Sequence, residues 1–207
     1  MDECCSNKQA EIERLAQRED QRRVLVVVLA INAVMFVGEF GAGVIAGSVA
    51  LMADAVDMFG DAMVYGLSLY ALNRSDRWRN GAALAKGVFI LIFGLGVLVQ
   101  VAIKIQSGVA PSSTTMLVVG AIALAANLTC LALLWRFRKQ DLNMSSTFEC
   151  SRNDVISNVG VLVAAMAVAA FNSGWPDIII GLVIAGLFLR SAYRVLSEAW
   201  PAFRASG

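Results

Sequence analysis

Histidine is absent from this sequence of 207 residues, and proline occurs only three times. Without histidine, the chain lacks the commonest metal ligand of proteins and the side chain that usually changes its charge near neutral pH. Charged residues are also few, at 16%, and their net charge is +1. So small a net charge is not typical of a nucleic-acid-binding protein, and we expect neither a nucleic-acid partner nor an acidic one.

Four cysteines are present, but they do not show the spacing of a disulfide framework. Cys130 and Cys150 fall in or beside apolar segments, and Cys130, which has no partner at helical spacing, is expected to pack. Cys4 and Cys5 could capture a soft metal, although a terminal pair alone is weak support for such a site. A secretory signal is not expected, because the first 23 residues are densely charged and contain no apolar core.

Apolar residues dominate what remains: they make up 58% of the chain, and its mean hydropathy is +0.67. Soluble domains contain about 45–50% apolar residues, so this composition indicates a lipid environment. Six apolar segments are long enough to cross a bilayer: residues 24–47, 48–73, 81–105, 116–135, 145–171 and 175–196. We therefore expect an all-α integral membrane protein with six transmembrane helices.

One membrane domain is expected over residues 23–200, between a cytoplasmic N-terminal segment (1–22) that favours a short polar helix and a short cytoplasmic tail (201–207). The first, third and fifth loops together hold a single basic residue, Lys104. Most other basic residues lie before the first span, around the second and fourth loops and near the end of the sixth span. Because basic residues favour the cytoplasmic side, both termini are expected in the cytoplasm, at a bacterial-type inner or plasma membrane.

The second span contains three aspartates, although a carboxylate at mid-bilayer costs about 2.5–3.5 kcal/mol even on insertion scales. Asp57 and Asp61 are four residues apart, so they share one helix face about 6 Å apart along the axis. Cys150 and Asp154 repeat this spacing in the fifth span. Two helices that each offer such a pair can surround a cation with three oxygens and one sulfur, which suits tetrahedral Zn²⁺ or Cd²⁺.

Other ionisable residues of the spans leave several roles open. Asp54 lies nearer the outer end of its helix, where capping, hydration or a helix contact is favoured over metal ligation. Glu39 in the first span and Asp177 at the start of the sixth could support the ligands, carry protons or pack. Arg152 either offsets the charge of the acids or extends toward the cytoplasm.

Four stretches, in their order and spacing, resemble the cation diffusion facilitator family of divalent-metal/proton antiporters: "NAVMFVGEFGAGVIAGSVALMADAVDMFGDA", "AANLTCLALL", "CSRNDVISNVG" and "PDIIIGLVIAGLFLRSAYRVLSEA". The resemblance covers residues 32–199. Family members place a D/H-x3-D pair on helix two and an H-x3-D pair on helix five. By position these pairs correspond to Asp57 with Asp61 and to Cys150 with Asp154, so Cys150 stands where the family usually has histidine.

The resemblance also implies a family-type bundle that forms homodimers. Small residues in "GAALAKG" and "GLGV" of the third span would permit close helix packing. The chain ends where a cytoplasmic ferredoxin-like domain normally follows in the family, so no C-terminal metal-sensing domain is expected. The histidine-rich cytoplasmic loop of some zinc carriers has no counterpart, because "RFRKQDLN" is short and basic.

Proton exchange follows from the charge of the expected site. Three carboxylates and a thiolate carry four negative charges, of which one divalent cation neutralises two, and the bilayer disfavours the remainder. The acids must therefore take up protons when no metal is bound, and metal binding expels them. We expect an antiporter that exports Zn²⁺ or Cd²⁺ from the cytoplasm, with no cofactor besides the transported ion and no enzymatic activity. The sequence leaves the order among Zn²⁺, Cd²⁺, Co²⁺, Mn²⁺, Fe²⁺ and Hg²⁺ open.

Three alternative functions agree less well with the sequence. An intramembrane aspartyl protease would need one acid on each of two helices, such as Asp61 and Asp154, but neither a cysteine nor repeated pairs. A non-transporting membrane metal sensor or adaptor is less favoured without the soluble domain. A cationic-drug exporter would surround a lone acid with aromatic side chains, whereas here the acids cluster.

Overall fold

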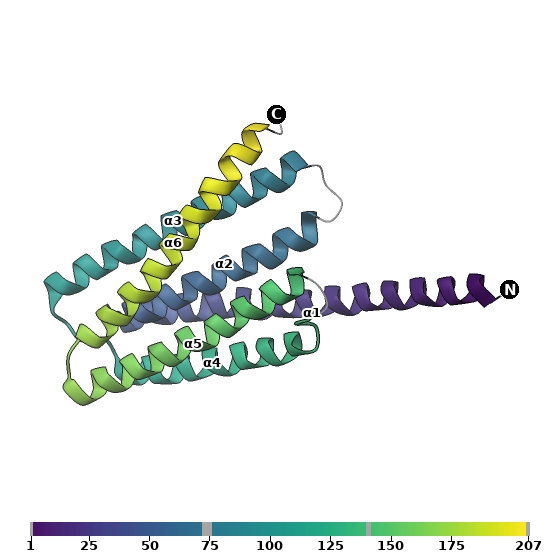
Figure 1. Ribbon diagram of the computed structural model, residues 1–207. Coiled ribbons are helices and arrows are strands. Elements are labelled where there is room, and N and C mark those ends of the chain that lie inside the picture. Colours follow the sequence, from purple (N-terminus) through teal and green to yellow (C-terminus); the bar gives the residue numbers. More distant parts are fainter. Residues whose placement is uncertain (1, 72–75, 140–141, 206–207) are drawn as a thin grey trace.

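The chain forms a bundle of helices in a computed structural model that describes residues 2–71, 76–139 and 142–205 (Figure 1). Six α-helices account for most of these residues, and no strand occurs among them. The helices are α1 (Asp2–Ala46), α2 (Val49–Ala71), α3 (Asp76–Ser107), α4 (Ser113–Trp135), α5 (Leu142–Phe171) and α6 (Trp175–Ala205). The all-α class predicted from the apolar runs is confirmed.

Membrane crossing is supported by length and by the chemistry of the surface. Within the described residues, five helices, all except α2, contain an apolar stretch of spanning length. α2 is also long enough, at 23 residues, but holds the three aspartates. Large apolar side chains lie on the outside of the bundle, including Val34, which is 71% exposed, and Ile45, which is 86% exposed. Such side chains are stable against lipid and not against water, so the protein is an integral membrane protein.

Every helix except α2 is longer than its predicted span, and α1 and α6 are extended the most. α1 continues from Asp2 without a separate polar helix, because residues 2–37 contain neither glycine nor proline to interrupt it. α6 does not end near residue 196 but continues through Pro201 to Ala205. Its last turns pack on α3, where a β-carbon at Gly81 would lie 3.3 Å from the Phe203 ring. This contact involves a residue that was expected to belong to a short cytoplasmic tail.

α2 lies at the centre of the bundle. The most extensive helix contacts pair α1 with α2, α3 with α6 and α4 with α5, and α2 also touches α3, α5 and α6. Residues 49–56 of α2 are all buried as a result. Figure 1 shows α3 and α6 diverging from α4 and α5 toward the end of the bundle where the C-terminus lies. The central position of α2 turns its aspartates toward protein and not toward lipid.

The turn between α1 and α2 is closed by a glycine. Gly47 has a positive φ of 64°, a conformation that a β-carbon disfavours. Its N–H donates to the carbonyl of Val44 at 3.2 Å, and the Ser48 N–H donates to the carbonyl of Gly43 at 2.9 Å. These two bonds form a Schellman motif, which ends α1 within one residue of the predicted boundary.

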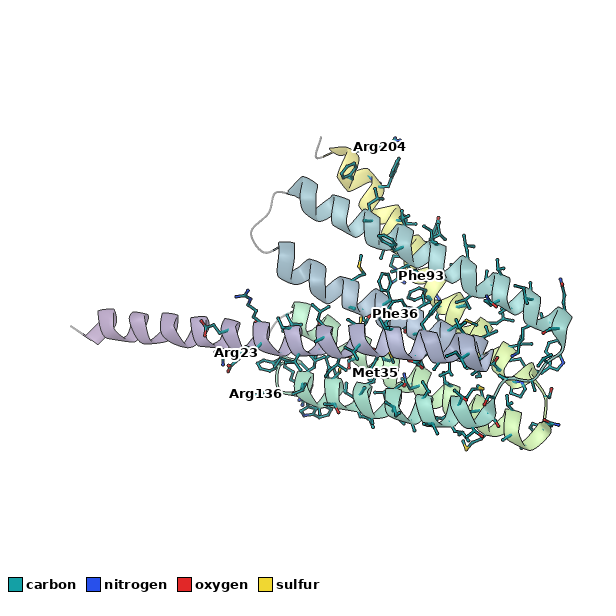
Figure 2. All side chains as sticks on the ribbon, turned by 180° about the vertical axis from the view of Figure 1, so that it is seen from behind. Arg23, Met35, Phe36, Phe93, Arg136 and Arg204 are labelled. Carbon is teal, nitrogen blue, oxygen red and sulfur yellow. The ribbon has the colours of Figure 1, made fainter. Side chains whose placement is uncertain are left out.

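Aromatic side chains fill the contact between α1, α2 and α3. Phe36 lies 4.9 Å from Phe59 and 6.0 Å from Phe93, measured between ring centroids. Phe36 and Phe93 point toward each other in Figure 2. Edge-to-face and tilted aromatic pairs of this kind stabilise the packing beyond the area they bury.

Glycines of α3 pack inside the same chain. A β-carbon at Gly87 would lie 2.8 Å from Leu196, and one at Gly94 would lie 2.6 Å from Leu189. Both leucines belong to α6. The small residues of "GAALAKG" and "GLGV" do permit close helix packing, as predicted, but at these two positions the neighbour is α6 and not a second copy of the chain.

Candidate metal centre

A cavity of about 510 Å³ lies between α2, α5 and α6. α2 and α5 supply its polar side, which includes all four predicted ligands: Asp57, Asp61, Cys150 and Asp154. α6 supplies an apolar wall of Ile184, Leu187 and Phe188. The cavity therefore combines ionisable donors with an apolar surround, in which electrostatic interactions are stronger than in water.

The two pairs reach this cavity because each lies on one face of its helix. Four residues make slightly more than one helical turn, so Asp57 and Asp61 point the same way from α2, as Cys150 and Asp154 do from α5. α2 and α5 are in contact and run in opposite directions (Figure 1). The two pairs therefore line the same cavity only because α2 and α5 are in contact.

The four predicted ligands differ in how deeply they are buried. Asp61 is 8% exposed and Asp154 is 4% exposed, whereas Asp57 and Cys150 are half-buried. Asp154 is within electrostatic reach of Asp61, Asp57 and Asp54, and its carboxyl group interacts directly with that of Asp61. Two acidic groups this close repel each other when both are ionised, which favours a proton or a cation between them.

The four donors face one cavity without forming a coordination sphere. Among the described residues, no three side chains of histidine, cysteine, aspartate or glutamate are close enough together to hold a metal ion. Zinc-type coordination needs oxygen ligands at about 2.0–2.2 Å and sulfur at about 2.3 Å. The side chains must therefore approach one another before all four could bind one ion.

Asp54 occupies a different environment from the other aspartates of α2. It is 1% exposed, and its Oδ2 accepts a hydrogen bond from Asn158 Nδ2 at 2.8 Å. The same amide nitrogen donates to the backbone carbonyl of Asp154 at 2.9 Å. Of the roles left open for Asp54, a helix contact is the one the structure shows.

Asn158 was missed by the sequence analysis. It follows Asp154 by four residues and is completely buried, at 0% exposure. A polar residue that continues the face of Cys150 and Asp154 by one more turn was the available signal. Glu39 of α1, also 0% exposed, lies close enough to Asp54 for their carboxyl groups to interact.

Asp177 caps α2 at the end of the bundle opposite the chain termini. Its Oδ1 accepts from Ser48 Oγ at 2.6 Å and from the Ala50 N–H at 3.0 Å, and its Oδ2 accepts from the Val49 N–H at 2.9 Å. Lys104 Nζ donates to the nearby carbonyl of Gly47. Of the roles left open for Asp177, packing is the one observed, and the sequence did not predict that it takes the form of a helix cap.

Arg152 pairs with an acid outside the cavity. Its guanidinium lies 2.5 Å from the carboxylate of Glu149, and both side chains are about half exposed, at 52% and 50%. Cys130 is 1% exposed in an apolar cluster with Leu134 and its neighbours, as expected for a packing residue. Cys4 and Cys5 lie outside the part of the chain whose side chains the structure describes.

Sequence comparison finds one family model and several relatives whose names describe metal transport. A family model described as the cation efflux transmembrane domain matches residues 25–202. A "Cadmium, cobalt and zinc/H(+)-K(+) antiporter" of Bacillus subtilis (strain 168) is 23% identical over 194 residues, covering 87% of this chain and 62% of the relative. The "Zinc transporter ZitB" of Yersinia pestis is 24% identical over 204 residues, covering 91% and 65%.

A third relative is the "Metal cation efflux system protein CzcD" of Cupriavidus metallidurans, 26% identical over 198 residues that cover 86% of this chain and 63% of the relative. The chain spans slightly less than two thirds of the length of these relatives. The family model, in contrast, covers most of the chain, and its description agrees with a helical bundle built for a membrane. The chain belongs to the cation efflux family.

Proposed function

We propose that this protein exports Zn²⁺ or Cd²⁺ from the cytoplasm in exchange for protons. The observation that carries the proposal is the single cavity whose wall holds paired donors from α2 and from α5. Three carboxylates and one thiolate form a ligand set suited to borderline-soft divalent ions. The three relatives, whose names refer to zinc, cadmium, cobalt or metal cations, support the same substrate class.

Proton exchange is part of the proposal because of where the donors lie. Asp61 and Asp154 are buried, and their carboxyl groups interact. Two ionised carboxylates in such a place are unstable without a compensating positive charge. Protons supply that charge when metal is absent, and a bound divalent ion replaces them. A carrier that alternates between these two states moves protons against metal.

The direction of access follows from the charges at the ends of the bundle. Arg23 and Arg136 lie at the end from which α1 projects (Figure 2), and basic residues favour the cytoplasmic side. We propose that this end, where α3 and α6 diverge from α4 and α5, faces the cytoplasm and admits metal. At the opposite end, the contacts of Asp177 with α2 and of Lys104 with Gly47 hold the helices together.

Transport into proteoliposomes tests the proposal directly. The purified chain is reconstituted with a metal-sensitive dye or a pH-sensitive dye inside, and a panel of divalent metals is added under an imposed proton gradient. We expect Zn²⁺ and Cd²⁺ to move with proton counter-flow, and an Asp154→Asn variant to move neither. Metal movement that does not depend on the proton gradient would contradict metal/proton exchange. The absence of any metal movement would contradict metal transport.

A further inference from the structure

A second pair of acids lies apart from the cavity that holds the four donors. Glu39 of α1 and Asp54 of α2 are 0% and 1% exposed, and their carboxyl groups are close enough to interact. Neither residue is among the described residues that line the cavity. The pair is thus a separate buried acidic group one helical turn from Asp57.

The hydrogen bonds of this pair are incomplete in a specific way. Neither carboxyl oxygen of Glu39 has a hydrogen-bond partner among the described residues, and Oδ1 of Asn158 has none either. Asp54, in contrast, accepts from the Asn158 amide at 2.8 Å. A carboxyl group that is buried without a hydrogen-bond donor is least stable when it is ionised.

In the described part of the chain, none of the contacts found for Glu39 or Asp54 is with a cationic side chain. The titratable groups on the helices packed around it include Asp57 and Asp61 on α2, Asp154 on α5, Asp177 on α6, Cys130 on α4 and Lys104 on α3. Lys104, the base in this set, is bound to the carbonyl of Gly47 and lies near Asp177. Glu39 and Asp54 therefore need a positive charge from another source.

We propose that Glu39 holds a proton that it shares with Asp54, so that this pair is a proton-binding site distinct from the metal ligands. This proton site rests on the proposed function, and Glu39 is then the residue that carries the exchanged proton. A single proton removes one of the two buried negative charges. It also gives Glu39 an O–H group that can donate a hydrogen bond. A carboxyl group and a carboxylate can then form a charge-assisted hydrogen bond.

Asn158 links this pair to the metal ligands. Its amide nitrogen donates both to Asp54 and to the backbone carbonyl of Asp154, and Asp54 is within electrostatic reach of Asp154. A divalent ion beside Asp154 lowers the cost of a second negative charge on the pair. The O–H bond of Glu39 then breaks, and its proton leaves for the solvent as the metal binds.

Counting the protons released by metal binding tests this site. Calorimetry follows the titration of each protein with Cd²⁺ in detergent, in buffers of different ionisation enthalpy. The proteins are the parent, Glu39→Gln and a control, Glu149→Gln, which replaces an exposed acid. We expect Glu39→Gln to bind Cd²⁺ within a few-fold of the parental affinity while releasing about one proton fewer per metal ion, and the control to match the parent. An unchanged proton count in Glu39→Gln overturns the proton site.

Further measurements separate the possible failures. If the parent binds no Cd²⁺, it is the proposed function that fails. If Glu39→Gln does not fold, Asp54→Asn removes the other half of the pair and is expected to show the same loss of one released proton. If neither variant folds, the infrared spectrum of the metal-free parent at neutral pH decides: the absence of a protonated-carboxyl band that disappears with Cd²⁺ overturns the inference.

Discussion

Individual aspartates of α2 differ in surroundings although they are only three or four residues apart. Asp54 is buried against Asn158, whereas Asp57 and Asp61 face the cavity shared with α5. Each side chain therefore carries a separate expectation: the two cavity residues should bind metal together with Cys150 and Asp154, and Asp54 should take part in proton binding with Glu39.

Removing one carboxylate from the cavity should abolish transport. Asp57→Asn, Asp61→Asn and Asp154→Asn keep the side-chain volume but leave the cation with one charge fewer. Loss of one partner from a buried charge pair costs about 3–5 kcal/mol, so we expect Cd²⁺ affinity to fall at least about 100-fold. Calorimetry and liposome uptake measure both effects, with Glu149→Gln as the control. If one of these variants still transports near the parental rate, the substituted residue is not a metal ligand.

Cys150 should set the preference between metals. A thiolate is softer than an imidazole, so the parent should favour Cd²⁺ over Zn²⁺ and bind hard Mn²⁺ and Mg²⁺ poorly. Cys150→His should retain transport and shift the Cd²⁺/Zn²⁺ affinity ratio toward Zn²⁺ by about tenfold or more, and Cys150→Ala should weaken Cd²⁺ more than Zn²⁺. Unchanged ratios in both variants would mean that the sulfur does not bind the ion.

The same substitution should change the pH dependence of binding. Every donor must lose its proton to bind metal, so affinity falls as pH decreases. An ordinary thiol has a pKa of about 8.5 and an ordinary imidazole one of about 6.5. Cd²⁺ affinity of the parent should therefore begin to fall at a higher pH than that of Cys150→His. Calorimetry at two pH values, such as about 6 and about 8, compares the slopes; equal slopes would contradict thiol ligation.

At the level of helices, the end of the bundle opposite the termini is organised around the start of α2. The first N–H groups of a helix have no partner within it, and Asp177 of α6 accepts two of them together with the hydroxyl of Ser48. Gly181, one turn further along α6, lets the two backbones approach closely: a β-carbon there would lie 3.0 Å from the carbonyl carbon of Val49 and 3.1 Å from the nitrogen of Ala50.

Loss of the Asp177 cap should destabilise the fold without changing metal affinity. Asp177→Ala leaves three buried donors without their acceptor, and we expect the free energy of unfolding to fall by about 1–3 kcal/mol. Thermal unfolding in detergent, followed by circular dichroism, measures this change, and Cd²⁺ calorimetry checks the site. Parental stability in Asp177→Ala, or a large loss of affinity without a loss of stability, would contradict a capping role.

A matched pair of glycines on α6 tests the close contact with α2. Gly181→Ala forces a β-carbon against backbone atoms that cannot rotate away, and overpacking of this kind costs about 1–3 kcal/mol. At Gly186 a β-carbon would meet nothing within 4 Å in the described part of the chain. Gly186→Ala should therefore be neutral or stabilise the helix by up to about 1 kcal/mol. Equal unfolding midpoints for the two variants would show that the contact does not limit packing.

For the molecule as a whole, the helix pairs explain where glycine is needed. Gly87 and Gly94 let α3 approach α6 closely, and these two helices diverge from α4 and α5 as one pair (Figure 1). Close packing at these positions is internal, and it leaves the apolar outer side chains of α3, such as Ile92 and Val99, on the surface.

A homodimer in the membrane stays a prediction. If two copies associate, they should do so through exposed apolar helix faces, since Gly87 and Gly94 already contact α6. Native mass measurement or light scattering in mild detergent should show a species of twice the 22.1 kDa chain mass. Monomers alone across a range of protein concentrations would contradict the dimer. A substitution of Ile92 by a polar residue should weaken the dimer only if the outer face of α3 takes part.

Much of the architecture could be predicted because the responsible interactions are local. Long apolar runs determined the existence of the spans, and Gly47 determined the break between the first two helices within one residue. The four-residue spacing of Asp57 with Asp61 and of Cys150 with Asp154 determined that each pair shares a face, because helix periodicity is a property of the backbone. These features need no knowledge of a neighbouring helix.

Tertiary packing decided what the spacing along one helix could not. It joined the two faces in one cavity, paired Glu39 with Asp54, and assigned Asn158 to a contact that bridges α2 and α5. It also assigned Asp177 to the start of α2 and the glycines of α3 to α6. Each of these outcomes depends on which helices touch and at what depth, and contacts between distant segments are selected by the packing of the whole bundle and not by the local sequence.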